Sequence, residues 1–483
     1  MSTGIEKKPN KSSRSEKFQS KLFYSVTGNI VYLIITCLTT FLLPKFLSEE
    51  GYGSFQLYLF YIGYIGFFHF GWADGVFLRY GGAYYEELDR ARFSRQFRLI
   101  TALEAILGAL ICVFSLTLIK DADKSVILFL TGLSVILLLP RTFLQHVLQS
   151  TDRFREYAIL TAVEKIVFAL IAVGALASGS RSFIIIAVAD VIGKLFALIY
   201  TVWCCRDIVR AKPESMDEGF REAWRNISVG INLMLANISS ALIIGIVRFA
   251  IERQWDVVTF GKISLTLSVS NFLMVFIRAV AMVMFPMLRR TEENRRAEIY
   301  GITRSCLMVP LLAMLVLYYP LRAVMSAWLP QYAESLAYMA LLFPVCIFES
   351  KTSMLIETYM KTMRRERWLL IINACTVGLS LVFTLVTVFL LRSLTLAVFS
   401  VVVLMGIRCI VGELLIAPMI KVEVRRDILM EISMISVFIV SGWYIGGIAS
   451  VLIYGAAYLV YLFLKRRDLA DLIAVIKPAL KRK

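Results

Sequence analysis

Histidine is almost missing from this sequence of 483 residues, which contains only His69 and His146. Two isolated histidines do not make a metal site of the common imidazole type, so we predict no metal and no cofactor. The sequence also lacks the G-x-x-x-x-G-K-[ST], G-x-S-x-G and H-E-x-x-H patterns. Because these patterns carry nucleotide hydrolysis and soluble-type hydrolysis, we expect no catalytic residues and predict that the protein is not an enzyme.

Cysteines are missing from every loop that we expect outside the membrane. The eight that occur lie within or at the inner ends of apolar runs: Cys37, Cys112, Cys204, Cys205, Cys306, Cys346, Cys375 and Cys409. No disulfide framework is therefore expected. The first 21 residues are polar and basic, and an apolar run of full span length follows them, so no cleavable signal peptide is expected either.

Apolar residues dominate the remainder of the chain, with 59% hydrophobic residues and a mean hydropathy of +0.74. A water-soluble domain could not hide so much apolar surface. The apolar runs are about 20 residues long, enough to cross a bilayer as helices, and they lack the alternation of barrel strands. We predict an all-α polytopic membrane protein with spans at 22–43, 52–73, 97–119, 125–149, 156–178, 182–205, 226–250, 258–288, 300–327, 333–360, 367–391, 394–420, 427–445 and 447–464.

Basic residues are distributed unequally between alternate loops. One side of the predicted membrane carries 36 lysines and arginines, including both terminal segments, and the other side carries eight. The positive-inside rule then puts both termini in the cytoplasm, which requires an even number of spans such as fourteen. The net charge of +17 reflects this orientation. The alternative, nucleic-acid binding, is disfavoured because no basic run is interleaved with aromatic residues.

A weak internal repeat divides the chain into two halves. Residues 25–29 (SVTGN) correspond to 228–232 (SVGIN), and Tyr52-Gly53 to Phe260-Gly261, at offsets of 203 and 208. Both halves begin on the same side, which indicates parallel repeats related by a pseudo-two-fold axis along the membrane normal. The expected divisions are a polar tail (1–21), an N-terminal six-helix lobe (22–205), a cytoplasmic linker (206–225), a C-terminal six-helix lobe (226–420), an additional helix pair (421–465) and a basic tail (466–483).

Two six-span lobes, asparagines in the first and seventh spans and the Phe285-Pro286-Met287-Leu288 end of the eighth span resemble a known superfamily. It is the multidrug/oligosaccharidyl-lipid/polysaccharide exporter superfamily, and within it the Wzx-type flippase branch is the most similar. This resemblance implies a flippase that moves a polyprenyl-diphosphate-linked oligosaccharide across the bacterial cytoplasmic membrane by alternating access, for surface polysaccharide synthesis. Membrane lipids, a glycan polymerase and glycosyltransferases are then the expected partners, and nucleic acid is not.

Charges inside the spans suggest where a diphosphate would bind. Arg141, Arg278 and Lys351 have no carboxylate three or four residues away, and Arg141 and Lys351 occupy similar positions in the fourth and tenth spans. Arginine can bind phosphate oxygens through two donors, and lysine adds a compact charge. The alternative, equally weighted, is that these bases pair with Glu349 or Glu413 on neighbouring helices.

Further candidates are placed less specifically. Lys194 and Arg248 could also contact the diphosphate, although Asp190 and Glu252 lie four residues from them. Polar residues expected in the cavity are Asn29, Asn232 and Asn237, and possible ion-coupling residues are Glu349, Glu357 and Glu413.

Three other features have simpler interpretations. Arg304 lies one turn inside a span and is expected at the interface. Residues 84–98 are expected to lie along the inner leaflet as an amphipathic stretch. The last two spans are interpreted as free of intramembrane charge, and in the resembling flippases an added pair of this kind helps to shelter the lipid tail.

Other functions stay open at this point. A lipid II flippase is chemically close and separable only by its substrate. A cation-coupled multidrug antiporter of the same superfamily would want an acidic cavity, whereas here unpaired bases outnumber unpaired acids. A membrane-embedded polymerase or ligase is disfavoured by the short outer loops.

Overall fold

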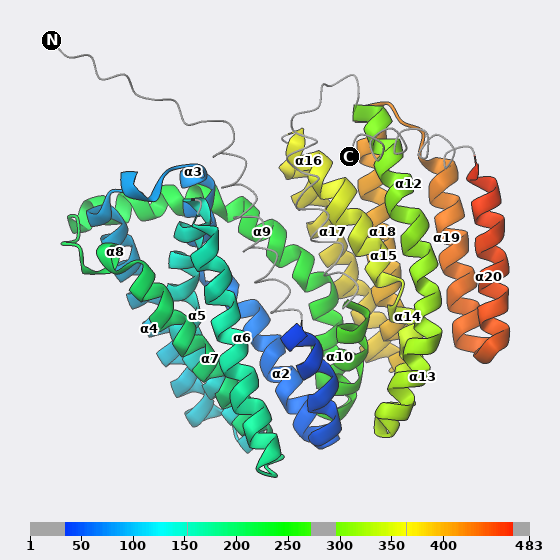
Figure 1. Ribbon diagram of the computed structural model, residues 1–483, viewed down its shortest axis with the longest axis horizontal. Coiled ribbons are helices and arrows are strands. Elements are labelled where there is room, and N and C mark those ends of the chain that lie inside the picture. Colours follow the sequence, from blue (N-terminus) through cyan, green and yellow to red (C-terminus); the bar gives the residue numbers. More distant parts are fainter. Residues whose placement is uncertain (1–33, 152, 272–295, 364, 467–483) are drawn as a thin grey trace. The chain divides into compact units, whose positions relative to one another are not determined.

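The structure is a computed structural model that describes residues 34–151, 153–271, 296–363 and 365–466 (Figure 1). Over these ranges the chain is built from helices joined by short turns, and no strand occurs among them. The predicted all-α class is therefore confirmed for the described part of the chain.

Eleven helices among the described residues are long and apolar enough to cross a membrane. They are Arg90–Leu118, Ala122–Ser150, Phe154–Ala177, Phe183–Cys204, Met216–Gln254, Ile299–Trp328, Ser335–Thr362, Arg367–Leu390, Leu394–Ile420, Arg425–Ile445 and Gly447–Leu464. Each coincides with one of the predicted spans. The multi-pass membrane architecture thus follows from both sequence and structure.

The other three predicted spans correspond to shorter helices. The first and the eighth are represented by the apolar helices Ile34–Phe46 and Val257–Ser270, and the remainder of both spans lies outside the described residues. The second is divided into α2 (Glu49–Ile65), the 3-10 turn η1 (Gly66–His69) and α3 (Trp72–Tyr80). The count of fourteen and the cytoplasmic termini therefore stay predictions.

The interruption of the second span has a local cause. Phe70 and Gly71 adopt left-handed backbone conformations, with φ of 52° and 80°, which end one helix and start the next. A Cβ atom on Gly71 would also lie 2.7 Å from the backbone of Gly230 in α9 (Met216–Gln254). The sequence predicts a continuous span over 52–73, because an apolar run reveals neither the left-handed backbone at Phe70 and Gly71 nor the close contact of Gly71 with α9.

The chain divides into two compact units, Met1–Met234 and Leu235–Lys483. In unit 1, α4 (Arg90–Leu118) packs along α5 (Ala122–Ser150), and α6 (Phe154–Ala177) packs along α7 (Phe183–Cys204), which also contacts α5 (Figure 1). The predicted linker 206–225 contains α8 (Arg206–Arg210) and the start of α9. The Gln96 side chain donates a hydrogen bond to the Gly219 carbonyl, so the start of α9 is attached to unit 1.

The helices described in unit 2 include α10 (Val257–Asn271), α12 (Arg296–Met314), α13 (Tyr318–Trp328), α14 (Met339–Leu342), α15 (Val345–Lys351), the π-helical η7 (Thr352–Glu357), α16 (Thr358–Thr362), α17 (Glu366–Thr384), α18 (Leu394–Ile420), α19 (Arg425–Val440) and α20 (Gly447–Leu464). The segment Ser335–Thr362 is central to this unit, because 89% of its most apolar 18 residues are buried, against 17% in α20. α18 packs against both α15 and α17, and α19 packs against α20.

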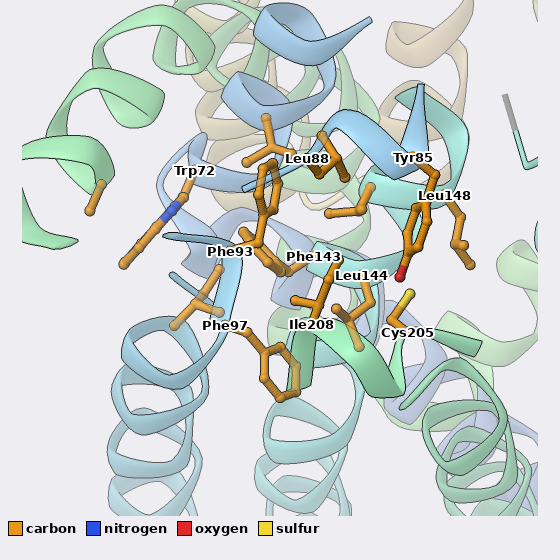
Figure 2. Close-up of a cluster of buried hydrophobic side chains, with 14 residues drawn as sticks. Trp72, Tyr85, Leu88, Phe93, Phe97, Phe143, Leu144, Leu148, Cys205 and Ile208 are labelled. Atoms are coloured by element: carbon orange, nitrogen blue, oxygen red, sulfur yellow. The ribbon is translucent and has the colours of Figure 1, made fainter. Parts of the chain in front are cut away.

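Buried aromatic and aliphatic side chains of unit 1 form a cluster, which we call the aromatic cluster (Figure 2). Leu88, Phe93 and Phe97 pack there against Phe143 of α5 and Ile208 of α8. Leu88, Phe93 and Phe97 of the stretch 84–98 are covered by the unit's own helices, whereas Tyr84 is 63% exposed, and α4 already begins at Arg90. The location of this stretch along the inner leaflet stays a prediction.

The connection to α8 is fixed by hydrogen bonds at the edge of this cluster. The Tyr85 hydroxyl donates to Asp207 over 2.8 Å, and Arg90 Nε donates to the same carboxylate over 3.0 Å. Partial burial acts to raise the pKa of Asp207, but these two hydrogen bonds outweigh it and lower the pKa below its usual value. Asp207 therefore stays ionised and holds α8 against the aromatic cluster.

Candidate functional site: buried charge clusters

Charged side chains within the helices gather in three buried clusters, each of which connects several helices. We name them after their arginines: the Arg141 cluster in unit 1, and the Arg304 and Arg408 clusters in unit 2. Burying so many charges is costly unless they are paired. The partners of each base therefore decide which charges are available to a substrate.

The Arg304 cluster joins four helices of unit 2. Arg304 of α12 contacts Glu413 of α18 at 2.7 Å, and Asp427 and Glu431 of α19 at 2.7 and 2.8 Å. Lys351 of α15 pairs with Glu413 and, at 2.6 Å, with Glu431. Lys465 completes the cluster by contacting Asp427 at 2.8 Å. Three bases face three acids, so the cluster is neutral as a whole.

One expectation is corrected by this cluster, and another stays a prediction. Arg304 is only 3% exposed and its guanidinium contacts three carboxylates, and its depth near the membrane interface stays a prediction. The last two predicted spans are not free of charge, because Glu431 is buried within the first of them. The same search for charges inside apolar runs would have found Glu431, which lies four residues after Asp427.

The Arg408 cluster lies elsewhere in unit 2 and contains two of the proposed coupling residues. Arg408 of α18 is 1% exposed and contacts Glu349 at 2.9 Å and Glu357 at 3.4 Å. Its Nε donates to Asn373 of α17 over 2.8 Å. Both carboxylates stay partly exposed, at 24% and 23%, and Lys361 contacts Glu357 at 3.1 Å. Glu349 and Glu357 therefore combine a buried counter-charge with a partly exposed carboxylate.

The Arg141 cluster occupies the interior of unit 1. Arg141 of α5 pairs with Glu164 of α6, and Lys165 lies 3.5 Å from the same carboxylate. On α7, Lys194 pairs with Asp190, as the spacing of four residues predicts. The two pairs are adjacent, since Lys194 interacts electrostatically with Glu164. Three bases and two acids thus meet among the described residues of the cluster.

Tyr58 of α2 connects the Asp190–Lys194 pair of α7 to α5. Its hydroxyl lies 3.0 Å from Asp190 Oδ2 and 3.1 Å from Ser134 Oγ of α5. The Lys194 ammonium lies 5.7 Å from the centre of the Tyr58 ring, within reach of a cation–π interaction. These contacts fix Lys194 in place, so it is a buried and oriented charge rather than a flexible one.

The remaining sequence candidates are not brought together with these clusters. Arg248 donates to Ser264 over 2.8 Å and lies over the Phe260 ring at 5.0 Å. Asn232 and Asn237 lie on exposed positions of α9. Arg278 and Asn29 fall outside the described residues.

Arg141 and Lys351 were singled out because they have no local partner in the sequence, and the structure gives each a partner on another helix. The alternative interpretation, pairing with Glu349 or Glu413 on a neighbouring helix, agrees with the Lys351–Glu413 pair. Arg141 also pairs with another helix, but its partner is Glu164, which that interpretation did not name. Glu413 lies between two bases and is 0% exposed, whereas Glu349 and Glu357 are partly exposed.

Comparison with known protein families identifies the family of this chain. The model of a family described as polysaccharide biosynthesis protein matches residues 19–292, more than half of the sequence. The chain belongs to this family. The comparison with curated proteins finds no match.

Solved structures show the same fold. The lipid II flippase MurJ in an inward closed conformation matches with a TM-score of 0.63 and 12% identity, over 93% of this chain and 99% of that one. An inward-facing multidrug resistance MATE family transporter of the MOP superfamily matches with a TM-score of 0.56 and 14% identity, over 85% and 98%. A MOP superfamily transporter from Pyrococcus furiosus matches with a TM-score of 0.51 and 14% identity, over 86% and 96%. The resemblance to the exporter superfamily is thereby confirmed, and these neighbours are transporters and flippases rather than enzymes.

Proposed function

We propose that this protein is a flippase that moves a polyprenyl-diphosphate-linked oligosaccharide across the bacterial cytoplasmic membrane. The family description supports a role in polysaccharide synthesis, and the fold supports movement of a substrate through a membrane. The observation that carries the substrate class is the Arg141 cluster, in which Arg141, Lys165 and Lys194 gather around Glu164 and Asp190.

Arg141, Lys165 and Lys194 lie together in this cluster, and such a group of basic side chains favours an anionic ligand. A diphosphate could share Arg141 with Glu164 and draw on Lys165, whose side chain is 21% exposed. Arg141 and Lys194 are thus kept as substrate-binding candidates, and Arg278 and Arg248 stay predictions. Lys351 is a weaker candidate because it is only 2% exposed and pairs with both Glu413 and Glu431.

The three basic side chains of this cluster also argue against a transporter for cationic drugs, which would need an acidic site. Coupling to protons or sodium, if present, is assigned to Glu349 and Glu357 because both are partly exposed. Glu413 fits this role less well, since Arg304 and Lys351 already neutralise it.

The test is a flipping assay in proteoliposomes with a polyprenyl diphosphate that carries a fluorescent sugar, read by quenching from one side. R141A alone would leave Glu164 without its arginine, so the variant of choice is R141A/E164Q, which removes both partners. We expect it to insert at normal abundance and to lose at least about 90% of flipping, because a lost arginine–phosphate interaction of about 1.5–3 kcal/mol lowers binding by tenfold or more. R181A, at an exposed position between α6 and α7, is the control and should flip normally. Normal flipping by well-inserted R141A/E164Q would exclude Arg141 from the site.

A further inference from the structure

Glu104 is buried in unit 1 without a partner. Its side chain is 0% exposed, and neither carboxyl oxygen has a hydrogen-bond partner among the described residues. It differs in this respect from the acids of the three clusters, each of which contacts at least one base. A carboxyl group in such a position needs a separate explanation.

The surroundings of Glu104 are apolar along its own helix. It lies on the face of α4 that packs against α5, between Ile100 one turn earlier and Leu107 one turn later. Ile100 belongs to the aromatic cluster of Figure 2, and Leu107 packs on a second buried cluster formed by Ile65, Val135 and Leu139. Apolar packing therefore adjoins the carboxyl group on both sides.

The helices are also too close at this level to admit water. One turn after Glu104, a Cβ atom on Gly108 would lie 2.7 Å from the carbonyl oxygen of Gly132 in α5, and a Cβ on Gly132 would lie 2.8 Å from that of Gly108. Only glycine allows two helix backbones to approach so closely. The contact closes the interface beside Glu104.

One backbone acceptor is freed at the level of Glu104. Pro140 of α5 has no N–H to donate to the carbonyl of Ile136, four residues earlier. Because α4 and α5 are antiparallel and Gly108 lies opposite Gly132, Ile136 lies opposite Glu104 in this register. A protonated carboxyl group has an O–H to offer to such an acceptor, whereas a carboxylate does not.

No basic side chain of the described residues forms a hydrogen bond with Glu104. Arg141 pairs with Glu164, and His69 accepts a hydrogen bond from the Gly71 backbone. The titratable and charged side chains of the neighbouring elements are Glu49, Glu50, Tyr52, Tyr58, Tyr61 and Tyr64 on α2, His69 on η1, Asp74, Arg79 and Tyr80 on α3, Asp123, Lys124, Arg141 and His146 on α5, Arg206, Asp207 and Arg210 on α8, and Asp217, Glu218, Arg221, Glu222 and Arg225 on the first part of α9. None of them forms a hydrogen bond with Glu104 in the described part of the chain.

An ionised carboxylate without a partner is too unfavourable in such an environment to persist, and a group in this position takes up a proton instead. We propose that Glu104 is a proton-binding site, occupied by a proton in this conformation. The carboxylate takes the proton from water and becomes a neutral acid, and the reverse step requires water to reach the α4–α5 interface. Proton release is then linked to separation of these two helices.

The direct test is infrared spectroscopy of the full-length protein in detergent or nanodiscs at neutral pH. Wild type should show the C=O stretching band of a protonated carboxylic acid, shifted in D₂O, and E104Q should lose that band. Glutamine has the size of the neutral acid, so E104Q should fold normally. E357Q is the control, since Glu357 contacts two bases, and it should keep the band. A wild-type spectrum without the band, or a band that survives in E104Q, would overturn the proposal.

Discussion

Arg304 and Glu431 form an ion pair between α12 and α19, with 2.8 Å between Nη2 and Oε1. Both side chains are almost completely buried, at 3% and 5% exposure. The pair attaches the C-terminal helices α19 and α20 to the lobe that precedes them. The predicted additional helix pair is therefore held to unit 2 by charge as well as by apolar packing.

Replacement of Glu431 should destabilise unit 2. E431Q leaves Arg304, Lys351 and Lys465 with only two carboxylates, and the removal of one partner of a buried ion pair costs about 3–5 kcal/mol. We expect a clear drop in melting temperature in detergent and a lower abundance in the membrane. E423Q is the matched control, because Glu423 is exposed in the turn before α19. Equal melting of E431Q and E423Q would show that the pair contributes nothing.

The helical spans could be predicted from the sequence because a membrane span is a local property. About 20 consecutive apolar residues suffice to define it, and the eleven helices of span length all fall on predicted positions. The break after Phe70 could not be predicted in this way. It depends on the close approach of α9 to Gly71, some 160 residues later, which no window of sequence reports.

The pairing of buried charges shows the same limit. The Asp190–Lys194 pair lies within one helix, and its spacing was enough to predict it. The carboxylates that neutralise Lys351 lie 62 and 80 residues away, on α18 and α19. Which residues face each other there depends on the depth and rotation of three helices. For that reason the sequence identified intramembrane charges but could not decide between a substrate site and structural pairs.

The contact between α3 and α9 gives a sharp steric prediction. A Cβ atom on Gly75 would lie 1.9 Å from the carbonyl oxygen of Asn226, so G75A must push the two helices apart. Overpacking of this kind costs about 3 kcal/mol, and we expect a lower melting temperature. In G174A, on α6, the new methyl group meets nothing within 4 Å. That control should be neutral or slightly stabilising, by about 0.5–1 kcal/mol. Similar melting of the two variants would contradict the described packing of α3 on α9.

The orientation in the membrane can be tested by cysteine labelling. Ser180 lies in the turn between α6 and α7, and Ser215 lies just before α9. In a background with the eight native cysteines replaced, S180C should react with an impermeant thiol reagent added outside intact cells, and S215C should react only after permeabilisation. Labelling of S215C in sealed cells would overturn the positive-inside assignment, and with it the cytoplasmic location of both termini.

Ion coupling is the last property that the described charges allow us to test. Arg408 keeps one carboxylate when the other is neutralised, so E349Q and E357Q should each lose about 2 kcal/mol of stability or less and stay folded. If either acid binds the coupling ion, its variant should flip the fluorescent polyprenyl diphosphate at the same rate with and without an imposed proton or sodium gradient, whereas wild type should respond to the gradient. E334Q, at an exposed position in unit 2, should behave as wild type. A full gradient response in both E349Q and E357Q would remove these residues from the coupling mechanism, and Arg408 would then be a structural charge that joins α15, α17 and α18.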